Sequence, residues 1–210
     1  MDWNELLQWS QKGFIASCAL VVQLTLSLAV GLESKEVKPS VSDKPLATEQ
    51  LAVYRAFLET WYGSEKAAIN LSVETNMLED SGQFSGEGCL KGLNLEENAG
   101  EVHRFRTEDL PQLGPFSFRL VDSEKQRREV ADNDPGKAIH NGTSVDDAVR
   151  NGFSHALFTL SEIRFDKDHT HAVVAYSFVC GELCGNGGIA TLEKKNGAWH
   201  RQDACGEWQA

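Results

Sequence analysis

The residues best suited to chemistry in this sequence are its cysteines. Five occur among 210 residues, and Cys180 and Cys184 lie together in the glycine-rich stretch CGELCGNGG. Cys89 and Cys205 are isolated, whereas Cys18 lies in an apolar run near the N-terminus. Four cysteines beyond such a run are typical of a disulfide-stabilised domain in an oxidising compartment. We therefore expect these four to be structural, with three pairings open.

The favoured pairing joins Cys180 to Cys184 and Cys89 to Cys205. The first bridge would close a turn between two strands, and the second would tie a long loop to the C-terminal segment. In the chain-entropy model, the short bridge stabilises the fold by about 2 kcal/mol and the long bridge by about 5 kcal/mol. The first would then shape a loop, and the second would hold the fold together.

Two other uses of these thiols are open. Four thiolates could bind zinc, although structural zinc sites usually bring their ligands in close pairs, and Cys89 and Cys205 have no close neighbour. Cys180 and Cys184 could serve a thiol redox protein, but such motifs usually separate the cysteines by two residues at a helix start. Here three residues intervene after a predicted strand. We predict no metal site and no cofactor.

Acid–base chemistry has one candidate. His155 lies on the polar face of a predicted helix, and Glu162 or Asp146 could act as its partner. None of the nucleophile motifs G-x-S-x-G, S-x-x-K and H-E-x-x-H accompanies them. A hydrolase-type enzyme with a pocket near His155 is therefore an alternative, and the catalytic residues remain unknown.

The elements that would position these residues indicate an α+β fold. Apolar residues at helical spacing predict helices over 48–62 and 144–157, and a short charged helix over 122–131. Ser144 and Asp147 approximate a capping box. The turn residues 133–136 are expected to end the charged helix. Residues 79–114 have no clear period, and we expect a long structured loop there.

Strands are predicted where the sequence becomes alternating or continuously apolar. They cover residues 68–74, 116–121, 159–165, 171–179, 188–195 and 198–201. Asn196 and Gly197 predict a type I′ turn between the last two strands. The result is a set of helices packed on a C-terminal antiparallel meander. This architecture is similar to that of cystatin-like and NTF2-like domains, which include both enzymes and binding proteins.

The N-terminal region predicts export. An uncharged run of nineteen residues begins at Phe14 and ends at Leu32, which as a helix is about 28 Å long, near the thickness of a bilayer core. It could be a signal peptide or an uncleaved membrane anchor, and both remain open. We therefore divide the chain into a leader (1–32), a linker (33–47) and a single α+β domain (48–210).

The formal charge of −11 argues against a nucleic-acid surface, which needs clustered Lys and Arg. The stretch from Cys180 to Gly185 (C-G-x-L-C-G), followed by Glu193 to Trp199 (E-K-x-x-G-x-W), resembles a group of uncharacterised bacterial exported proteins. The resemblance implies a periplasmic or other extracytoplasmic location, with the inner membrane as the site of any anchor. It supplies no catalytic residues. The leading hypothesis is a non-catalytic domain that binds a small ligand or an envelope protein.

Overall fold

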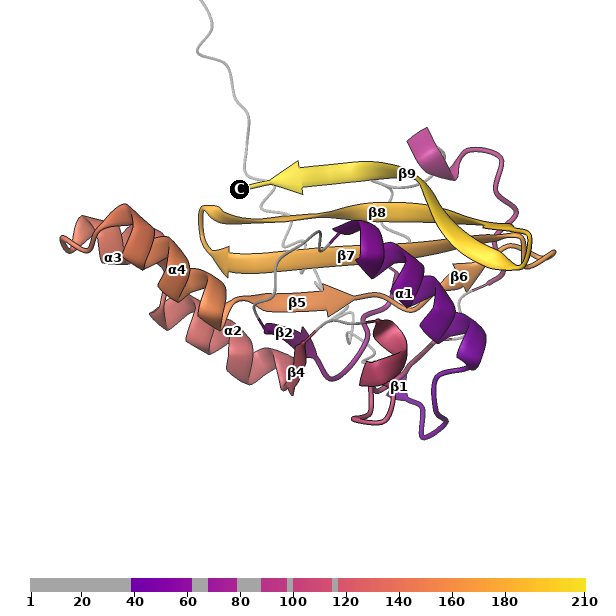
Figure 1. Ribbon diagram of the computed structural model, residues 1–210, viewed down its shortest axis with the longest axis horizontal. Coiled ribbons are helices and arrows are strands. Elements are labelled where there is room, and N and C mark those ends of the chain that lie inside the picture. The colour runs from indigo at the N-terminus through magenta and orange to yellow at the C-terminus, as the bar shows by residue number, and fades with distance from the viewer. Residues whose placement is uncertain (1–38, 62–67, 79–87, 98–99, 115–116) are drawn as a thin grey trace, which may run out of the picture. The chain divides into compact units, whose positions relative to one another are not determined.

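The computed structural model describes residues 39–61, 68–78, 88–97, 100–114 and 117–210. The folded unit, Lys38–Ala210, contains both helices and a mixed sheet (Figure 1), which confirms the predicted α+β class. The apolar run from Phe14 to Leu32 lies outside the described residues. Within the described ranges, no helix is both long and apolar enough to span a bilayer.

The helical elements lie in two groups along the chain. They are α1 (Thr48–Trp61), the short 3-10 turns η1 (Gly88–Leu90) and η2 (Leu110–Leu113), and then α2 (Ser123–Asp132), α3 (Pro135–His140) and α4 (Val145–His155). The strands are β1 (Ser40–Val41), β2 (Ile69–Ser72), β3 (Glu101–Val102), β4 (Phe118–Val121), β5 (Leu157–Leu160), β6 (Arg164–Phe165), β7 (His171–Gly181), β8 (Cys184–Lys195) and β9 (Ala198–Gln209).

The large sheet has the strand order β4-β2-β5-β7-β8-β9, with β6 also paired to β7. Strands β5, β7, β8 and β9 are antiparallel neighbours, as predicted, whereas β2 runs parallel to both β4 and β5. Asn196 and Gly197 both have positive φ angles, which a type I′ turn requires. Strands β8 and β9 are longer than the sequence predicted, so the hairpin forms a large part of the sheet.

Helix α1 covers one face of this sheet (Figure 1). Its apolar stripe, which includes Leu51, Tyr54 and Phe57, is buried against side chains from β5, β7 and β8. The ring of Phe57 lies 5.0 Å from that of Tyr176 on β7. The core also includes Leu46, and β1 pairs with β3. The structure therefore places residues 40–46 in the folded unit and not in a tether.

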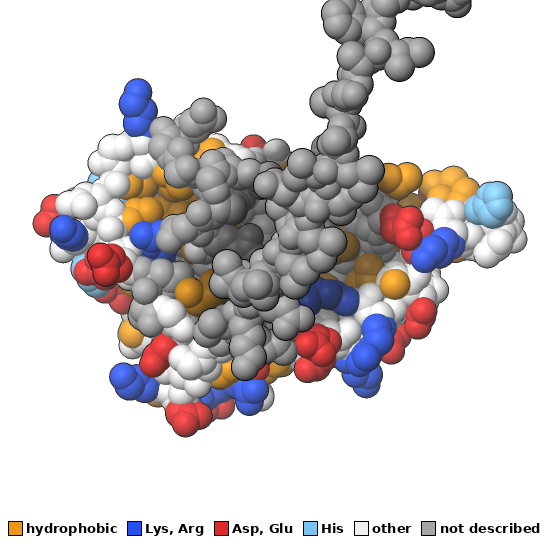
Figure 2. Space-filling model, turned by 180° about the vertical axis from the view of Figure 1, so that it is seen from behind, with side chains coloured by type: hydrophobic (Ala, Val, Ile, Leu, Met, Phe, Trp, Pro, Cys, Tyr) orange, Lys and Arg blue, Asp and Glu red, His pale blue; other side chains and the backbone are white. Residues whose placement is uncertain are grey.

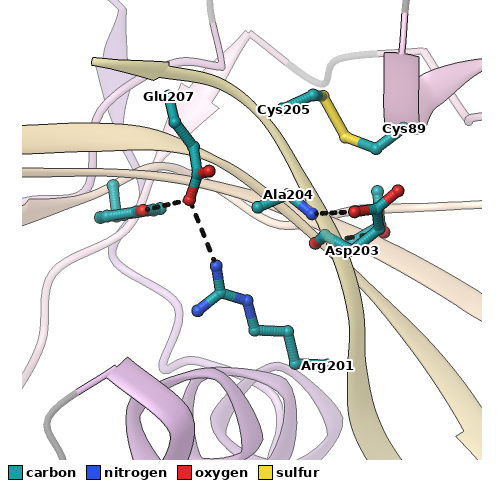
Figure 3. Close-up of a disulfide and its surroundings, with 8 residues drawn as sticks. Cys89, Arg201, Asp203, Ala204, Cys205 and Glu207 are labelled. Atoms are coloured by element: carbon teal, nitrogen blue, oxygen red, sulfur yellow. Dashed lines mark hydrogen bonds and ion pairs between the residues drawn. A yellow bond between two sulfur atoms is a disulfide. The ribbon is translucent and has the colours of Figure 1, made fainter.

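A smaller apolar cluster occupies the opposite face. Val173 and Ile189 project there from β7 and β8, and they pack against Leu78 and the segment around η1. Cys89 belongs to that segment and bonds to Cys205 on β9 (Figure 3). The disulfide thus fixes a segment with little regular structure against the sheet.

Helices α3 and α4 differ from the prediction in two ways. Helix α4 ends at His155, because Ala156 is extended and Leu157 begins β5. Its apolar residues Val145 and Phe153 belong to the helical spacing from which the helix was predicted, but they are 59% and 48% exposed.

The second difference is α3, which was not predicted. Asp134, Pro135 and Gly136 were interpreted as the end of a helix, but they begin a new one. Asp134 is its N-cap and Pro135 its first residue, where the missing N–H of proline has no cost.

The four cysteines of the domain form the two favoured pairs, Cys89–Cys205 and Cys180–Cys184. The first pair is separated by 116 positions and the second by 4. The double substitution of Cys89 and Cys205 by Ser should lower the free energy of unfolding by about 5 kcal/mol, and that of Cys180 and Cys184 by about 2 kcal/mol. Guanidinium unfolding of the two variants measures this difference. Equal losses, or a larger loss from the short bridge, would contradict the assigned roles.

Candidate ligand-binding cleft

A cleft of about 420 Å³ lies between α2 and the sheet, a volume in the range of small-molecule sites. Its floor consists of β5 and β7, on the face turned away from α1, because Phe158 and Phe178 pack in the α1 core and their strand neighbours point the other way. Figure 2 views the molecule from that side, where apolar side chains are interspersed with acidic and basic ones.

The floor combines two apolar and two hydroxyl side chains. Leu157 pairs with Val179, and Thr159 pairs with Ser177, across the antiparallel strands. The four side chains therefore form adjacent pairs on one face. The hydroxyls of Thr159 and Ser177 have no hydrogen-bond partner among the described residues. The floor thus offers polar atoms that no described residue satisfies and that a ligand could bind.

One face of α2 forms the wall. Arg127, Val130 and Ala131 line the cleft, and their spacing of three and four residues places them on the same side of the helix. Val130 is buried, whereas the Arg127 side chain is exposed. Arg127 forms no hydrogen bond or ion pair within the described ranges. The wall therefore provides an apolar surface and a positive charge that no described residue pairs with.

The turn between β7 and β8, which the Cys180–Cys184 disulfide closes and which we call the disulfide hairpin, forms one end of the cleft. Asp134 holds this hairpin in position. Asp134 Oδ2 accepts a hydrogen bond of 2.6 Å from the Glu182 N–H, and Oδ1 accepts one of 2.9 Å from the Lys137 N–H. The carboxylate is buried, at 4% exposure. The bonds from Glu182 and Lys137 hold the pKa of Asp134 below its ordinary value, although burial acts in the opposite direction. One side chain thus caps α3 and holds the hairpin.

Two glycines permit this close packing. A Cβ on Gly181 would lie 2.6 Å from Asp134 Oδ2 and 2.7 Å from Pro135 Cδ. A Cβ on Gly152 in α4 would lie 2.5 Å from Pro135 Cγ. Because real Cβ atoms do not approach other atoms so closely, glycine is needed at both positions.

The cysteines of the hairpin contribute to its shape. Cys180 is almost fully buried, and its bond to Cys184 closes the turn from which Leu183 projects into solvent. In the described part of the chain, no group of three or more His, Cys, Asp or Glu residues is arranged to hold a metal ion. The other disulfide, between Cys89 in η1 and Cys205 in β9, does not contribute to this hairpin.

His155 lines a different cavity, of about 690 Å³, on the other side of α2. Neither predicted partner reaches it. Asp146 is nine residues earlier in the same helix, a rise of about 13 Å, and Glu162 bonds to His103 instead. The His155 Nδ1 atom lies 2.9 Å from the Asn151 carbonyl oxygen. The predicted acid–base pair at His155 is therefore wrong.

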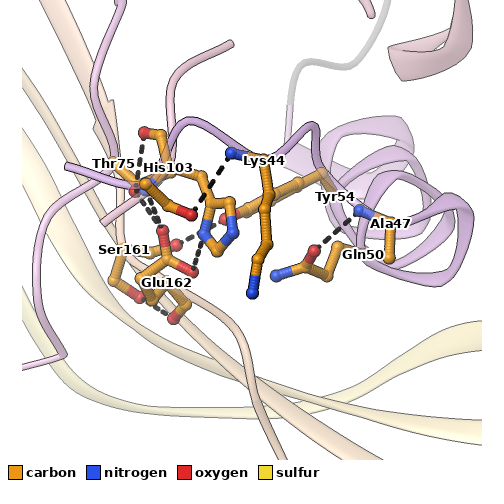
Figure 4. A network of polar contacts seen from close by, with 9 residues as sticks. Lys44, Ala47, Gln50, Tyr54, Thr75, His103, Ser161 and Glu162 are labelled. Atoms are coloured by element: carbon orange, nitrogen blue, oxygen red, sulfur yellow. Dashed lines mark hydrogen bonds and ion pairs between the residues drawn. The ribbon is translucent and has the colours of Figure 1, made fainter. Parts of the chain in front are cut away.

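Glu162 belongs to a buried polar network that the sequence did not reveal (Figure 4). One carboxylate oxygen accepts hydrogen bonds from the Thr75 hydroxyl and from the His103 N–H, and the other lies 3.0 Å from His103 Nδ1. Nearby, the Tyr54 hydroxyl donates to the Ser161 carbonyl oxygen. Burial, and then the Glu162 charge, raise the pKa of Tyr54. This network joins the His103 segment to the sheet, and none of its residues lines either cleft.

Comparison of the chain with protein families, curated proteins and solved structures finds no match. The function has to be inferred from the cleft and from the fold that forms it.

Replacing Asp134 with Asn should destabilise the protein by about 1–3 kcal/mol at pH 7, because a buried charged acceptor of two backbone N–H groups is lost. The pKa of Asp134 in the folded protein is lower than its ordinary value of 3.8. The charged carboxylate therefore stabilises the fold at pH values above 3.8, and this stabilisation is lost as the pH falls below 3.8 and through the lowered pKa. The difference between the wild type and Asp134→Asn should therefore shrink from pH 7 to pH 3.

Urea unfolding at several pH values measures this difference. The control is Asp132→Asn, which changes the charge equally at an exposed position of α2 and should alter stability by less than about 0.5 kcal/mol. Equal effects of the two substitutions would show that Asp134 does not hold the hairpin.

Proposed function

We propose that this chain is an exported or membrane-tethered, non-catalytic binding protein whose folded unit binds a small amphipathic molecule in the cleft between α2 and strands β5 and β7. One observation carries the proposal: the hydroxyls of Thr159 and Ser177, which have no hydrogen-bond partner in the described part of the chain, lie beside Leu157 and Val179 on the cleft floor. Unbonded polar groups in such a site favour a ligand that bonds to them.

The shape of the cleft supports binding of a small molecule. Most of the surface that its lining residues expose is apolar, with polar groups at defined places, which is the usual composition of ligand sites. The hairpin end is held by Asp134 and by the Cys180–Cys184 bridge. A site held in place before binding avoids much of the ordering cost that a ligand would otherwise meet.

The chemistry of the cleft supports binding more than catalysis. Asp134, a carboxylate in its lining, already accepts hydrogen bonds from two backbone N–H groups. Neither Thr159 nor Ser177 is bonded to a base among the described residues, and an activated nucleophile needs one. A redox role for Cys180 and Cys184 is also less well supported. Cys180 is buried and only Cys184 is half-exposed, and their spacing of four positions between two strands differs from the closer pair at a helix start that redox motifs use.

An envelope hydrolase remains the second candidate function. The cavity beside His155 supports it, since ionisable residues such as Arg119, Asp122 and Glu129 also line that cavity. Among the described residues, no carboxylate is bonded to the His155 ring. Its Nδ1 atom lies against the Asn151 carbonyl oxygen and the Ser154 hydroxyl, and the predicted partner Glu162 pairs with His103.

Export is proposed from the disulfides and from the sequence. Two disulfides are typical of a chain that folds in an oxidising, extracytoplasmic environment. The apolar run ending at Leu32 and the resemblance of the C-G-x-L-C-G stretch to exported bacterial proteins agree with that location.

Titration with hexan-1-ol, a small neutral amphiphile, tests the proposal. We expect amide chemical-shift changes around Leu157, Ser177 and Val179, with saturation. Ser177→Leu should fill the floor and weaken binding at least tenfold, since it removes the space and a hydroxyl. Thermal unfolding confirms that the variant is folded.

Ser154→Leu is the matched control, because it places the same side chain in the cavity beside His155. If Ser154→Leu abolishes binding and Ser177→Leu does not, the His155 cavity is the site. If hexan-1-ol perturbs no residue of the α2 cleft, the proposed function is wrong.

A further inference from the structure

The charges around the cleft point to the chemical class of its ligand. We infer that the cleft selects a monocarboxylate with an apolar chain, and that Arg127 is the residue that pairs with the carboxylate. This inference rests on the proposed function, and it adds the sign of the ligand's charge.

The ionisable groups that line the cleft are Arg127, Asp134 and Glu182. Both oxygens of the Asp134 carboxylate already accept a hydrogen bond from a backbone N–H, at 2.6 and 2.9 Å. The Glu182 carboxylate lies 3.6 Å from Lys137 Nζ. Arg127 has no partner within the described ranges. Of the three lining charges, the positive one is therefore the charge left for a ligand.

The position of Arg127 suits a head group at one end of an apolar chain. Arg127, Val130 and Ala131 share one face of α2, so a chain lying along Val130, Leu157 and Val179 can place its head group beside the guanidinium. A guanidinium binds a carboxylate through two parallel hydrogen bonds. Thr159 and Ser177 offer further donors on the floor.

A single negative charge matches the cleft better than two. One guanidinium can balance a carboxylate, whereas a phosphate dianion would leave excess negative charge close to Asp134 and Glu182. The whole chain carries a formal charge of −11, which disfavours anions in general. Any preference for an anion must then come from local contacts and not from the overall field.

The test compares hexanoate with hexan-1-ol, which have the same chain length and differ in charge. Dissociation constants are measured at pH 7 for the wild type, Arg127→Gln and Arg128→Gln. Arg128 is the neighbouring residue, is exposed, and does not line the cleft. The two substitutions change the net charge equally, so only the local pairing differs between them.

We expect the wild type and Arg128→Gln to bind hexanoate about fivefold more tightly than hexan-1-ol, as a partly exposed ion pair of about 1 kcal/mol implies. Arg127→Gln should lose this preference and keep its affinity for hexan-1-ol. If hexan-1-ol binds in the cleft but hexanoate is not preferred, or if both substitutions act alike, the inference is overturned and the proposed function stands. If neither compound perturbs the cleft, both fail.

Discussion

The hydrogen bonds of the Asp134 carboxylate join the helical part of the fold to the disulfide hairpin, and the cleft depends on them. One oxygen caps α3 and the other binds the Glu182 N–H of the β7–β8 turn. Bonds to a buried carboxylate are stronger than those between neutral groups. Gly181 and Gly152 allow the hairpin, Pro135 and α4 to approach each other closely. The end of the cleft is therefore defined by hydrogen bonds and packing as well as by the Cys180–Cys184 bridge.

The two faces of the sheet are covered in different ways. On one face, α1 completes a continuous apolar core. On the other, the Cys89–Cys205 bridge holds a segment of the chain over β8 and β9, and α2 stands over β5 and β7. Helix α2 separates two cavities, because Arg127 and Val130 line one while Gln126 and Glu129 line the other. The cleft arises where the helix stands above hydroxyl side chains and not above a filled core.

The sequence predicted what local patterns determine. The meander, the Asn196–Gly197 turn, the Ser144 cap and the two cysteine pairs are all present. The cleft could not be predicted in the same way, because Thr159 and Ser177 meet only through the register of β5 on β7. Glu162 was predicted as a partner of His155, but the structure pairs it with His103 instead. Its partner, His103, lies in a segment without periodicity, and unlike Cys89 of the same segment it is not of a residue type that indicates a long-range partner.

Amide hydrogen exchange at Glu182 tests most directly whether the Asp134 carboxylate holds the hairpin. Residues at the tip of a short hairpin normally exchange quickly, and the neighbouring Leu183, which is 84% exposed, provides the internal comparison. If Asp134 holds the hairpin against α3, exchange of the Glu182 amide should be slower than that of an unstructured chain by about two orders of magnitude or more. Exchange of Glu182 as fast as that of Leu183, at the unprotected rate, would contradict the account.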